Sequence, residues 1–151
     1  LWDGLTDKLL LALRKEWPTV LWRREFVVPG EYERQQWDIG GMVPGTGVYV
    51  AIEEEVGRPT AVRNVNKTWM MCDKTKQATR LVQIFSPLFH DTSWIQRFDE
   101  AAFIGGKAQI ETSTILSYSP IRLQLWPLYD PTLVPRLIGE IKTILQPLDG
   151  L

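Results

Sequence analysis

A run of apolar residues from Val48 to Ile52 leads directly into three glutamates, Glu53 to Glu55. An uninterrupted apolar run of this length is typical of a strand that is buried on both faces of a central sheet. Three adjacent carboxylates repel one another unless solvent, a cation or basic side chains offset their charge. The stretch therefore predicts a central strand that ends in a charged site, although a solvated turn at a strand end also gathers acidic residues.

Length and composition predict one domain that spans residues 1–151. The chain has 151 residues, which is enough for one well-buried domain and too few for two. Its composition, 44% apolar and 23% charged, is ordinary for a globular domain. The single cysteine, Cys72, excludes an internal disulfide and a cysteine-based zinc site, and we expect a cytoplasmic protein. No apolar run approaches the roughly 18 residues that span a membrane, and the N-terminus lacks a signal-peptide pattern. Since the chain starts with Leu1 rather than Met, we expect further residues before it in the natural protein.

The net charge of −1 hides an uneven distribution of charge. From Glu31 to Glu55, six acidic residues stand against one basic residue, a balance of −5. From Arg58 to Arg80, six basic residues stand against one acidic residue, a balance of +5. An acidic centre followed by a basic flank suits an enzyme that holds metal cations and acts on a polyanion. His90, the only histidine, is expected in a loop and by itself does not indicate a zinc site.

Hydrophobic periodicity and turn residues predict nine consecutive segments. They are a helix over Leu5–Trp17, strands over 19–28, Tyr32–Ile39 and Gly47–Glu55, a helix over Thr60–Asp73, a strand over Thr79–Ser86, a helix over Ser93–Ala108, one or two strands over Thr112–Leu125, and a helix over Leu133–Leu145. Gly40-Gly41 and the following Pro44 to Gly47 predict a hairpin-like loop, and Gly105-Gly106 should weaken the end of the third helix. The fold class is α/β, with a mixed central β-sheet flanked by helices and with parallel third and fourth strands.

The alternation of side chains along a strand sorts the three glutamates. Glu53 and Glu55 fall on one face of the third strand, and Glu54 falls on the other. Asp38 lies near the end of the preceding strand. With a loop that begins at Gly40, direct antiparallel pairing would place Asp38 beside the start of the third strand. A site that joins Asp38 to Glu53 therefore requires a stagger or a twist between the two strands.

Asp38 followed by Glu53-Glu54-Glu55 at the end of an apolar strand resembles the PD-(D/E)XK nuclease core. In that family, an Asp on one strand and an acidic-X-Lys motif on the next hold catalytic magnesium. The predicted order, helix, three strands, helix and strand (αβββαβ), is also similar to the common core of the family, and here C-terminal additions follow it. Glu55 departs from the pattern because most members carry Lys there, while some type II restriction endonucleases share the Glu-X-Glu variant.

The resemblance implies a role for each of these residues. Asp38 and Glu53 would be ligands of Mg²⁺, or of Mn²⁺ in its place, and the backbone carbonyl of Glu54 would be a further ligand. Glu55 would be another ligand or would orient the attacking water. The Asn-X-X-Lys that ends in Lys67 is similar to what such enzymes place after the acidic strand. Lys67 would contact a phosphate oxygen or position the water, and so take over part of the role of the missing motif lysine.

Glu25 on the first strand is a further candidate, as an outer metal ligand. Glu16 on the first helix is its competitor for that role. Glu25 also has a purely structural explanation, since it can pair with Arg23 or Arg24 on the surface.

The resemblance implies a Mg²⁺-dependent deoxyribonuclease, similar to restriction endonucleases, that hydrolyses DNA phosphodiester bonds. A symmetric homodimer is expected if the enzyme cuts both strands at a palindrome. Replacement of Glu53 by Ala is expected to abolish cleavage and to leave the fold intact. One alternative is a catalytically inactive member of the fold that serves as a DNA-binding or assembly module. Another is an acid/base enzyme that uses Glu53 and Glu55 as a carboxylate pair, as glycoside hydrolases do.

Overall fold

The helices and strands follow one another along the chain in the predicted order. The computed structural model describes residues 2–30, 34–55, 60–85, 93–123, 131–146 and 148, and the side chains of these residues except 2–3 and 93–96. His90 and the first residues of the predicted second strand lie outside this part of the chain. The elements are α1 (Trp2–Glu16), β1 (Arg23–Val27), β2 (Gln36–Val43), β3 (Val48–Glu55), α2 (Ala61–Thr75), β4 (Thr79–Phe85), α3 (Ser93–Glu111), β5 (Leu116–Arg122) and α4 (Leu133–Leu145).

The strands form one mixed sheet in the order β1-β2-β3-β4-β5. The pairs β1/β2 and β2/β3 are antiparallel, and the pairs β3/β4 and β4/β5 are parallel. This confirms the predicted α/β class and the parallel pairing of the strands on either side of α2. It also confirms that β3 is a central strand, since every residue from Val50 to Glu55 is buried.

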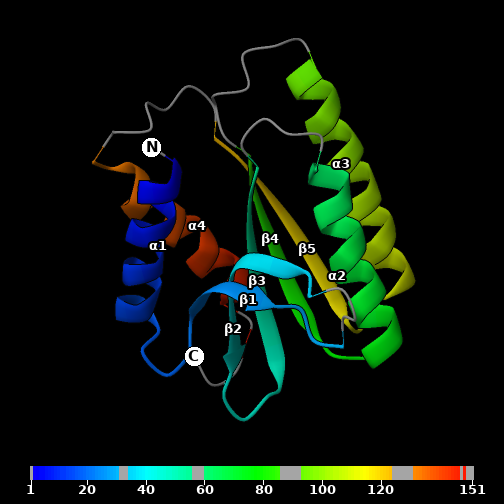
Figure 1. The fold of residues 1–151 in the computed structure, drawn as a ribbon, viewed down its shortest axis with the longest axis horizontal. Helices are drawn as coiled ribbons and strands as arrows, with labels where there is room; N and C mark the ends of the chain where they lie inside the picture. The colour runs from blue at the N-terminus through cyan, green and yellow to red at the C-terminus, as the bar shows by residue number, and fades with distance from the viewer. Residues whose placement is uncertain are drawn as a thin grey trace.

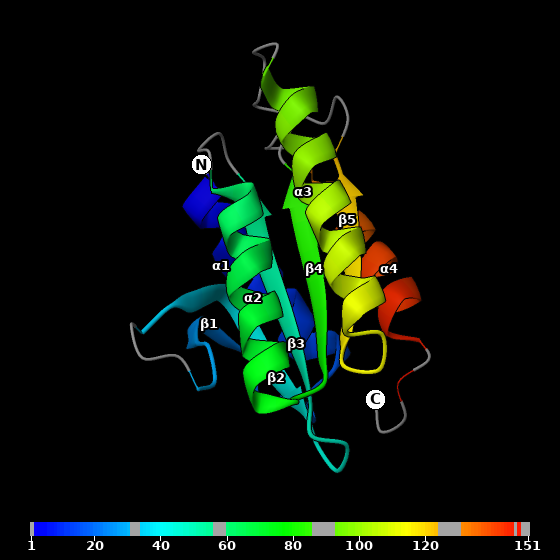
Figure 2. The ribbon, with the colours of Figure 1, turned by 90° about the vertical axis from the view of Figure 1, so that its right-hand side faces the viewer.

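Helices cover both faces of the sheet. Helices α1 and α4 lie against one face, and α2 and α3 lie against the other (Figures 1 and 2). One apolar cluster joins the first pair of helices to the sheet, and it includes Leu9, Leu13, Leu137 and Ile141. A second joins the other pair, and it includes Val65, Cys72, Ala101 and Ala108. Among the described helices, none has the length and apolar character needed to cross a membrane.

The second strand differs from its prediction, and glycines are the reason. Strand β2 continues through Gly40 and Gly41, which pair with Ala51 and Val50 of β3, and the turn lies at residues 44–47. A Cβ on Gly40 would lie 2.6 Å from Cγ of Phe26. A Cβ on Gly41 would lie 2.7 Å from Cγ1 of Val20. These glycines therefore let neighbouring side chains pack against the strand backbone, and the expectation that they form part of the loop is wrong.

Helix α3 also extends further than predicted, to Glu111. Gly105 and Gly106 lie inside it and do not end it. A Cβ added to Gly105 would overlap the ring of Tyr118 on β5, whereas a Cβ on Gly106 would meet no atom within 4 Å. Gly105 is therefore a point of close approach between α3 and the sheet.

The adjacent pair Gly105 and Gly106 gives a matched test of this packing. We expect Gly105→Ala to lower the free energy of unfolding by about 1–3 kcal/mol, because Tyr118 must move to admit the methyl group. We expect Gly106→Ala to raise it by up to about 1 kcal/mol, because alanine is the better helix former and has open space here. Urea denaturation of the two variants measures both changes. Equal effects in the two variants would contradict the close approach.

Candidate active site

The register between β2 and β3 brings Asp38 to the acidic end of β3. Ile39 pairs with Ile52 and Gly40 with Ala51, so that Asp38 lies just beyond the paired residues, beside the end of β3. The Oδ2 atom of Asp38 accepts a hydrogen bond of 2.7 Å from the backbone N–H of Glu54. The expected placement of Asp38 near the start of the third strand is therefore wrong, and no stagger is needed, because β2 runs on through its two glycines.

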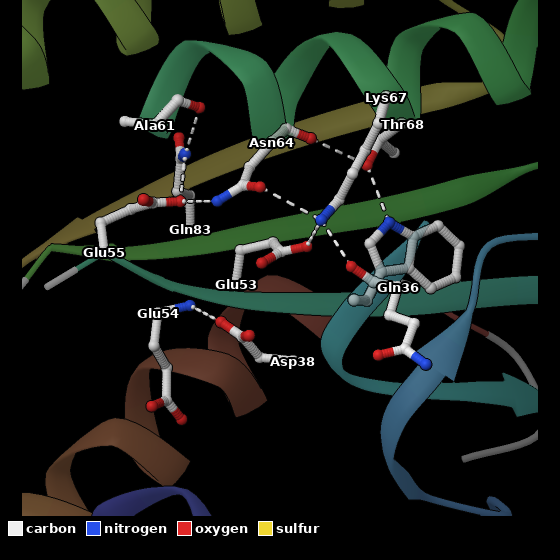
Figure 3. Close-up of polar contacts among 11 residues, drawn as sticks. Gln36, Asp38, Glu53, Glu54, Glu55, Ala61, Asn64, Lys67, Thr68 and Gln83 are labelled. Atoms are coloured by element: carbon white, nitrogen blue, oxygen red, sulfur yellow. Dashed lines mark hydrogen bonds and ion pairs between the residues drawn. The ribbon is translucent and has the colours of Figure 1, made fainter. Parts of the chain in front are cut away.

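Lys67 reaches Glu53 from helix α2. The ammonium nitrogen of Lys67 lies 2.5 Å from Oε1 of Glu53, and both side chains are buried, at 9% and 3% exposure (Figure 3). The same nitrogen donates hydrogen bonds to the backbone carbonyl of Gln36, at 2.5 Å, and to Oδ1 of Asn64, at 3.1 Å. Because α2 follows directly after β3 and crosses over the sheet, its first two turns lie above the acidic end of that strand. The predicted Asn-X-X-Lys pair thus projects toward the glutamates.

Glu55 is held by two amide groups. Its Oε1 atom accepts a hydrogen bond of 2.7 Å from Nδ2 of Asn64 and one of 2.9 Å from Nε2 of Gln83 on β4. Glu55 therefore lies on the same face of the sheet as Glu53, as the alternation predicted, and both point toward α2 (Figure 3). Its position is set by a helix and by the neighbouring parallel strand together.

Burial dominates the electrostatics of the two glutamates. It raises the pKa of Glu53 well above the ordinary value, while the ammonium of Lys67 opposes that rise and the charges of Asp38 and Glu55 add to it. Burial also raises the pKa of Glu55, against the hydrogen bonds from Asn64 and Gln83, which lower it. Each carboxylate would therefore be stabilised in its charged form by an additional cation at this end of β3.

Glu54 projects to the opposite face, toward α1. Its Oε2 atom accepts a hydrogen bond of 2.7 Å from the hydroxyl of Thr6. The backbone N–H of Glu54 donates the hydrogen bond to Asp38 described above. That its carbonyl oxygen is a metal ligand stays a prediction.

The outer candidates lie apart from this buried group. Glu25 is exposed and has a backbone φ of 53°, between the register pairs Arg24–Ile39 and Phe26–Trp37 of β1 and β2. Glu16, its competitor, is at the end of α1 and makes an ion pair of 2.9 Å with Lys142 of α4, on the other side of the sheet from α2. The role of Glu25 as an outer metal ligand also stays a prediction.

The donor atoms at this site suit a hard divalent cation. Mg²⁺ is usually held through one or two carboxylates, and water and substrate oxygens complete its coordination. Asp38 and Glu53 provide two carboxylates near the end of β3, one at the backbone N–H of Glu54 and the other at the ammonium of Lys67. In the part of the chain that the structure describes, no three side chains of the His, Cys, Asp or Glu types are arranged to hold a metal ion. The described residues therefore form no closed cage, and that Asp38 and Glu53 hold Mg²⁺ stays a prediction.

Two residues of this network, Gln83 and Tyr118, were not predicted from the sequence. Gln83 is fully buried, and besides Glu55 it contacts the carbonyl of Ala61, at 2.8 Å, and the hydroxyl of Tyr118, at 2.6 Å. The available signal was a single polar residue in the otherwise apolar second part of β4, residues 81–85, since a buried amide requires partners. That signal identifies Gln83 as unusual, but it does not indicate which residues Gln83 contacts.

In comparisons with known proteins, no family model matches this sequence, and no curated protein matches it significantly.

Proposed function

We propose that this protein is a Mg²⁺-dependent deoxyribonuclease with a restriction endonuclease-like core. The observation that carries the proposal is the contact between the buried ammonium of Lys67 and Glu53, with Asp38 at the backbone N–H of the next residue, Glu54. An Asp, a Glu and a Lys are the residue types of the PD-(D/E)XK site, and here the lysine comes from a helix, whereas the family motif places it on the strand. The order of elements from α1 to β4, and the antiparallel β1-β2-β3 followed by a parallel β4, support the same core.

The side chains would divide the work of phosphodiester hydrolysis. Asp38 and Glu53 would hold Mg²⁺, which supplies Lewis acidity and lowers the pKa of bound water. The ammonium of Lys67 would neutralise charge on a phosphate oxygen, a role for which its buried position suits it because charges interact more strongly away from bulk water. Glu55, held through Oε1 by Asn64 and Gln83, would orient the attacking water with its other oxygen. The basic flank from Arg58 to Arg80, with exposed Arg63 and Lys74 on α2, would face the DNA backbone.

The proposal predicts cleavage that depends on a divalent cation. We expect the purified protein to cut duplex DNA in millimolar Mg²⁺ or Mn²⁺, to lose activity completely in excess EDTA, and to regain it when Mg²⁺ is restored. A gel assay with a supercoiled plasmid and linear fragments of varied sequence measures cleavage, and calorimetry measures binding of Mg²⁺ to the protein alone. Cleavage that persists in EDTA would contradict the proposal.

A catalytically inactive DNA-binding or assembly module is the second candidate. It is favoured by the hydrogen bonds and the ion pair that already engage each carboxylate within the protein, since such a network can also serve a purely structural end. Calorimetry separates the two candidates. A module would bind no Mg²⁺ at millimolar concentration, with or without DNA, whereas the nuclease would bind it more tightly when DNA is present.

A further inference from the structure

A chain of buried hydrogen bonds runs from the far strand of the sheet to Glu55. The hydroxyl of Tyr118 on β5 donates to Oε1 of Gln83 on β4, at 2.6 Å, and Nε2 of Gln83 donates to Oε1 of Glu55 on β3, at 2.9 Å. Tyr118 and Gln83 are 9% and 0% exposed. Because the chain crosses three neighbouring strands, the rigid sheet fixes the separation of its members.

The groups on either side of the Gln83 amide determine its orientation, and with it the direction in which these hydrogen bonds are donated. The amide oxygen of Gln83 faces a hydroxyl donor, and its amide nitrogen faces two acceptors, Glu55 and the carbonyl of Ala61. A flipped amide would set its oxygen against both acceptors, an arrangement that leaves two buried partners unsatisfied. Burial also raises the pKa of Tyr118 above its usual value, with the charge of Glu55 adding to the rise, so the hydroxyl retains its proton. Tyr118 therefore orients Gln83, and Gln83 orients Glu55.

The packing around Tyr118 maintains this geometry. Gly105 of α3 lies directly against the ring, where any side chain would overlap it. The backbone N–H of Tyr118 donates a hydrogen bond of 2.7 Å to Oε1 of Gln109, also on α3. Gly105 and Gln109 thus fix the position of Tyr118, whose hydroxyl contacts Gln83.

The hydrogen bonds that Glu55 accepts from Asn64 and Gln83 both fall on the same carboxylate oxygen, Oε1.

We propose that Tyr118 and Gln83 are positioning residues that hold Glu55 through Oε1, so that its second carboxylate oxygen is directed to the metal ion or the attacking water. This rests on the proposed nuclease function, because the value of a fixed Glu55 lies in that reaction. Neither residue contacts the reacting atoms. Partners behind a metal ligand typically change metal affinity or activity by about 10-fold to 100-fold when they are replaced.

A double-mutant cycle tests the proposal. Tyr118→Phe keeps the ring that packs on Gly105 and removes only the hydroxyl, while Gln83→Met removes the amide at similar volume. We expect Tyr118→Phe to lower kcat at saturating Mg²⁺ by about 10-fold with KM for DNA unchanged, and to weaken Mg²⁺ binding measured by calorimetry. We expect Gln83→Met to have at least as large an effect and the double variant to be no worse than Gln83→Met alone, because Tyr118 acts through Gln83. Tyr49→Phe is the matched control, since Tyr49 packs against Phe26 and Trp37 on the same sheet, and it should retain wild-type values.

Additive losses in the double variant, or wild-type kcat and Mg²⁺ affinity in Tyr118→Phe, would overturn the proposal. If Gln83→Met does not fold, the cycle is run with Glu55→Gln, in which the effect of Tyr118→Phe should disappear. The side-chain amide signals of Gln83 in NMR spectra of the metal-free protein supply a readout independent of activity. They should shift in Tyr118→Phe and stay in place in Tyr49→Phe. If the Gln83 signals shift but the protein does not cleave DNA, the proposed nuclease function is contradicted and the positioning role is not. If the enzyme is active but the signals do not shift, the positioning role is contradicted and the nuclease function is not.

Discussion

Replacement of Glu53 by Gln should reduce Mg²⁺-dependent DNA cleavage by on the order of 10³-fold or more, because it removes one of the two carboxylates proposed to hold the metal ion. Loss of the charge stabilisation that a bound metal supplies is worth several kcal/mol in the transition state, and each 1.36 kcal/mol is about tenfold in rate. Gln is preferable to Ala here because it preserves the volume of the buried side chain and leaves an oxygen as acceptor for Lys67. Single-turnover cleavage at saturating Mg²⁺ measures the effect.

The structure indicates that a loss of stability should accompany the loss of activity in Glu53 variants. The sequence-based expectation was that Glu53→Ala would leave the fold intact, but Glu53 is the ion-pair partner of a buried lysine. Removal of one partner from a buried ion pair leaves the other charge buried without a counter-charge, which typically lowers the stability by about 3–5 kcal/mol. We therefore expect Glu53→Ala to be both inactive and less stable, and Glu53→Gln to be inactive with a smaller loss of stability. Glu140→Gln, which makes the same change on the exposed surface of α4, is the control and should match the wild-type protein in both respects.

Replacement of Lys67 by Met should lower the free energy of unfolding by about 3 kcal/mol and reduce cleavage by about 100-fold. The ammonium of Lys67 is the counter-charge of Glu53, and it also satisfies the carbonyl of Gln36 and the side-chain oxygen of Asn64. Met fills a similar volume but donates no hydrogen bond. Urea denaturation and cleavage kinetics measure the two effects. Lys74→Met, on the exposed side of the same helix, should change stability by less than about 0.5 kcal/mol.

The pH dependence of the Lys67→Met variant supplies a second signature. Burial raises the pKa of Glu53 above the ordinary value of 4.5, and Lys67 is the main group that opposes the rise. Without Lys67 the raised pKa favours the protonated carboxyl in the folded state. A group whose pKa is raised on folding stabilises the protein at pH values below its unfolded pKa and loses that contribution as the pH rises through the folded pKa. The stability deficit of the variant should therefore grow from pH 4 toward neutrality, and a deficit that does not change with pH would be evidence against the buried pair.

The two substitutions should also be strongly coupled. In the combined variant Glu53→Gln with Lys67→Met, neither buried charge remains, so no stranded ion has to be accommodated. We expect this variant to be more stable than Lys67→Met alone and to remain inactive. Such a result would separate the contribution of the pair to folding from its contribution to the reaction.

Local patterns predicted most of the elements and part of the site. The helix over Leu133–Leu145 has the bounds that its amphipathic pattern indicated. The separation of Glu54 from Glu53 and Glu55 is likewise confirmed, because side-chain alternation along a strand depends only on the local backbone. Periodicity alone was sufficient for these two predictions. Lys67 was predicted instead from the resemblance of its Asn-X-X-Lys to the PD-(D/E)XK pattern, and the helix brings Asn64 and Lys67 to one face because they are three residues apart.

By itself, the sequence determined the α/β class and the central position of β3. It also determined which acidic side chains lie at the end of β3 and which lysine lies on α2. Only the tertiary structure decided that Asp38 reaches the acidic end of β3, where it contacts the backbone of Glu54, and that Gln83 and Tyr118 lie behind Glu55. The register depends on whether Gly40-Gly41 turns the chain or admits Phe26 and Val20 against it, and the sequence of β2 alone is compatible with both. The chain from Tyr118 to Glu55 depends on which strands pair and on a helix packing without a side chain at Gly105. These are contacts between residues far apart in sequence, which local periodicity does not encode.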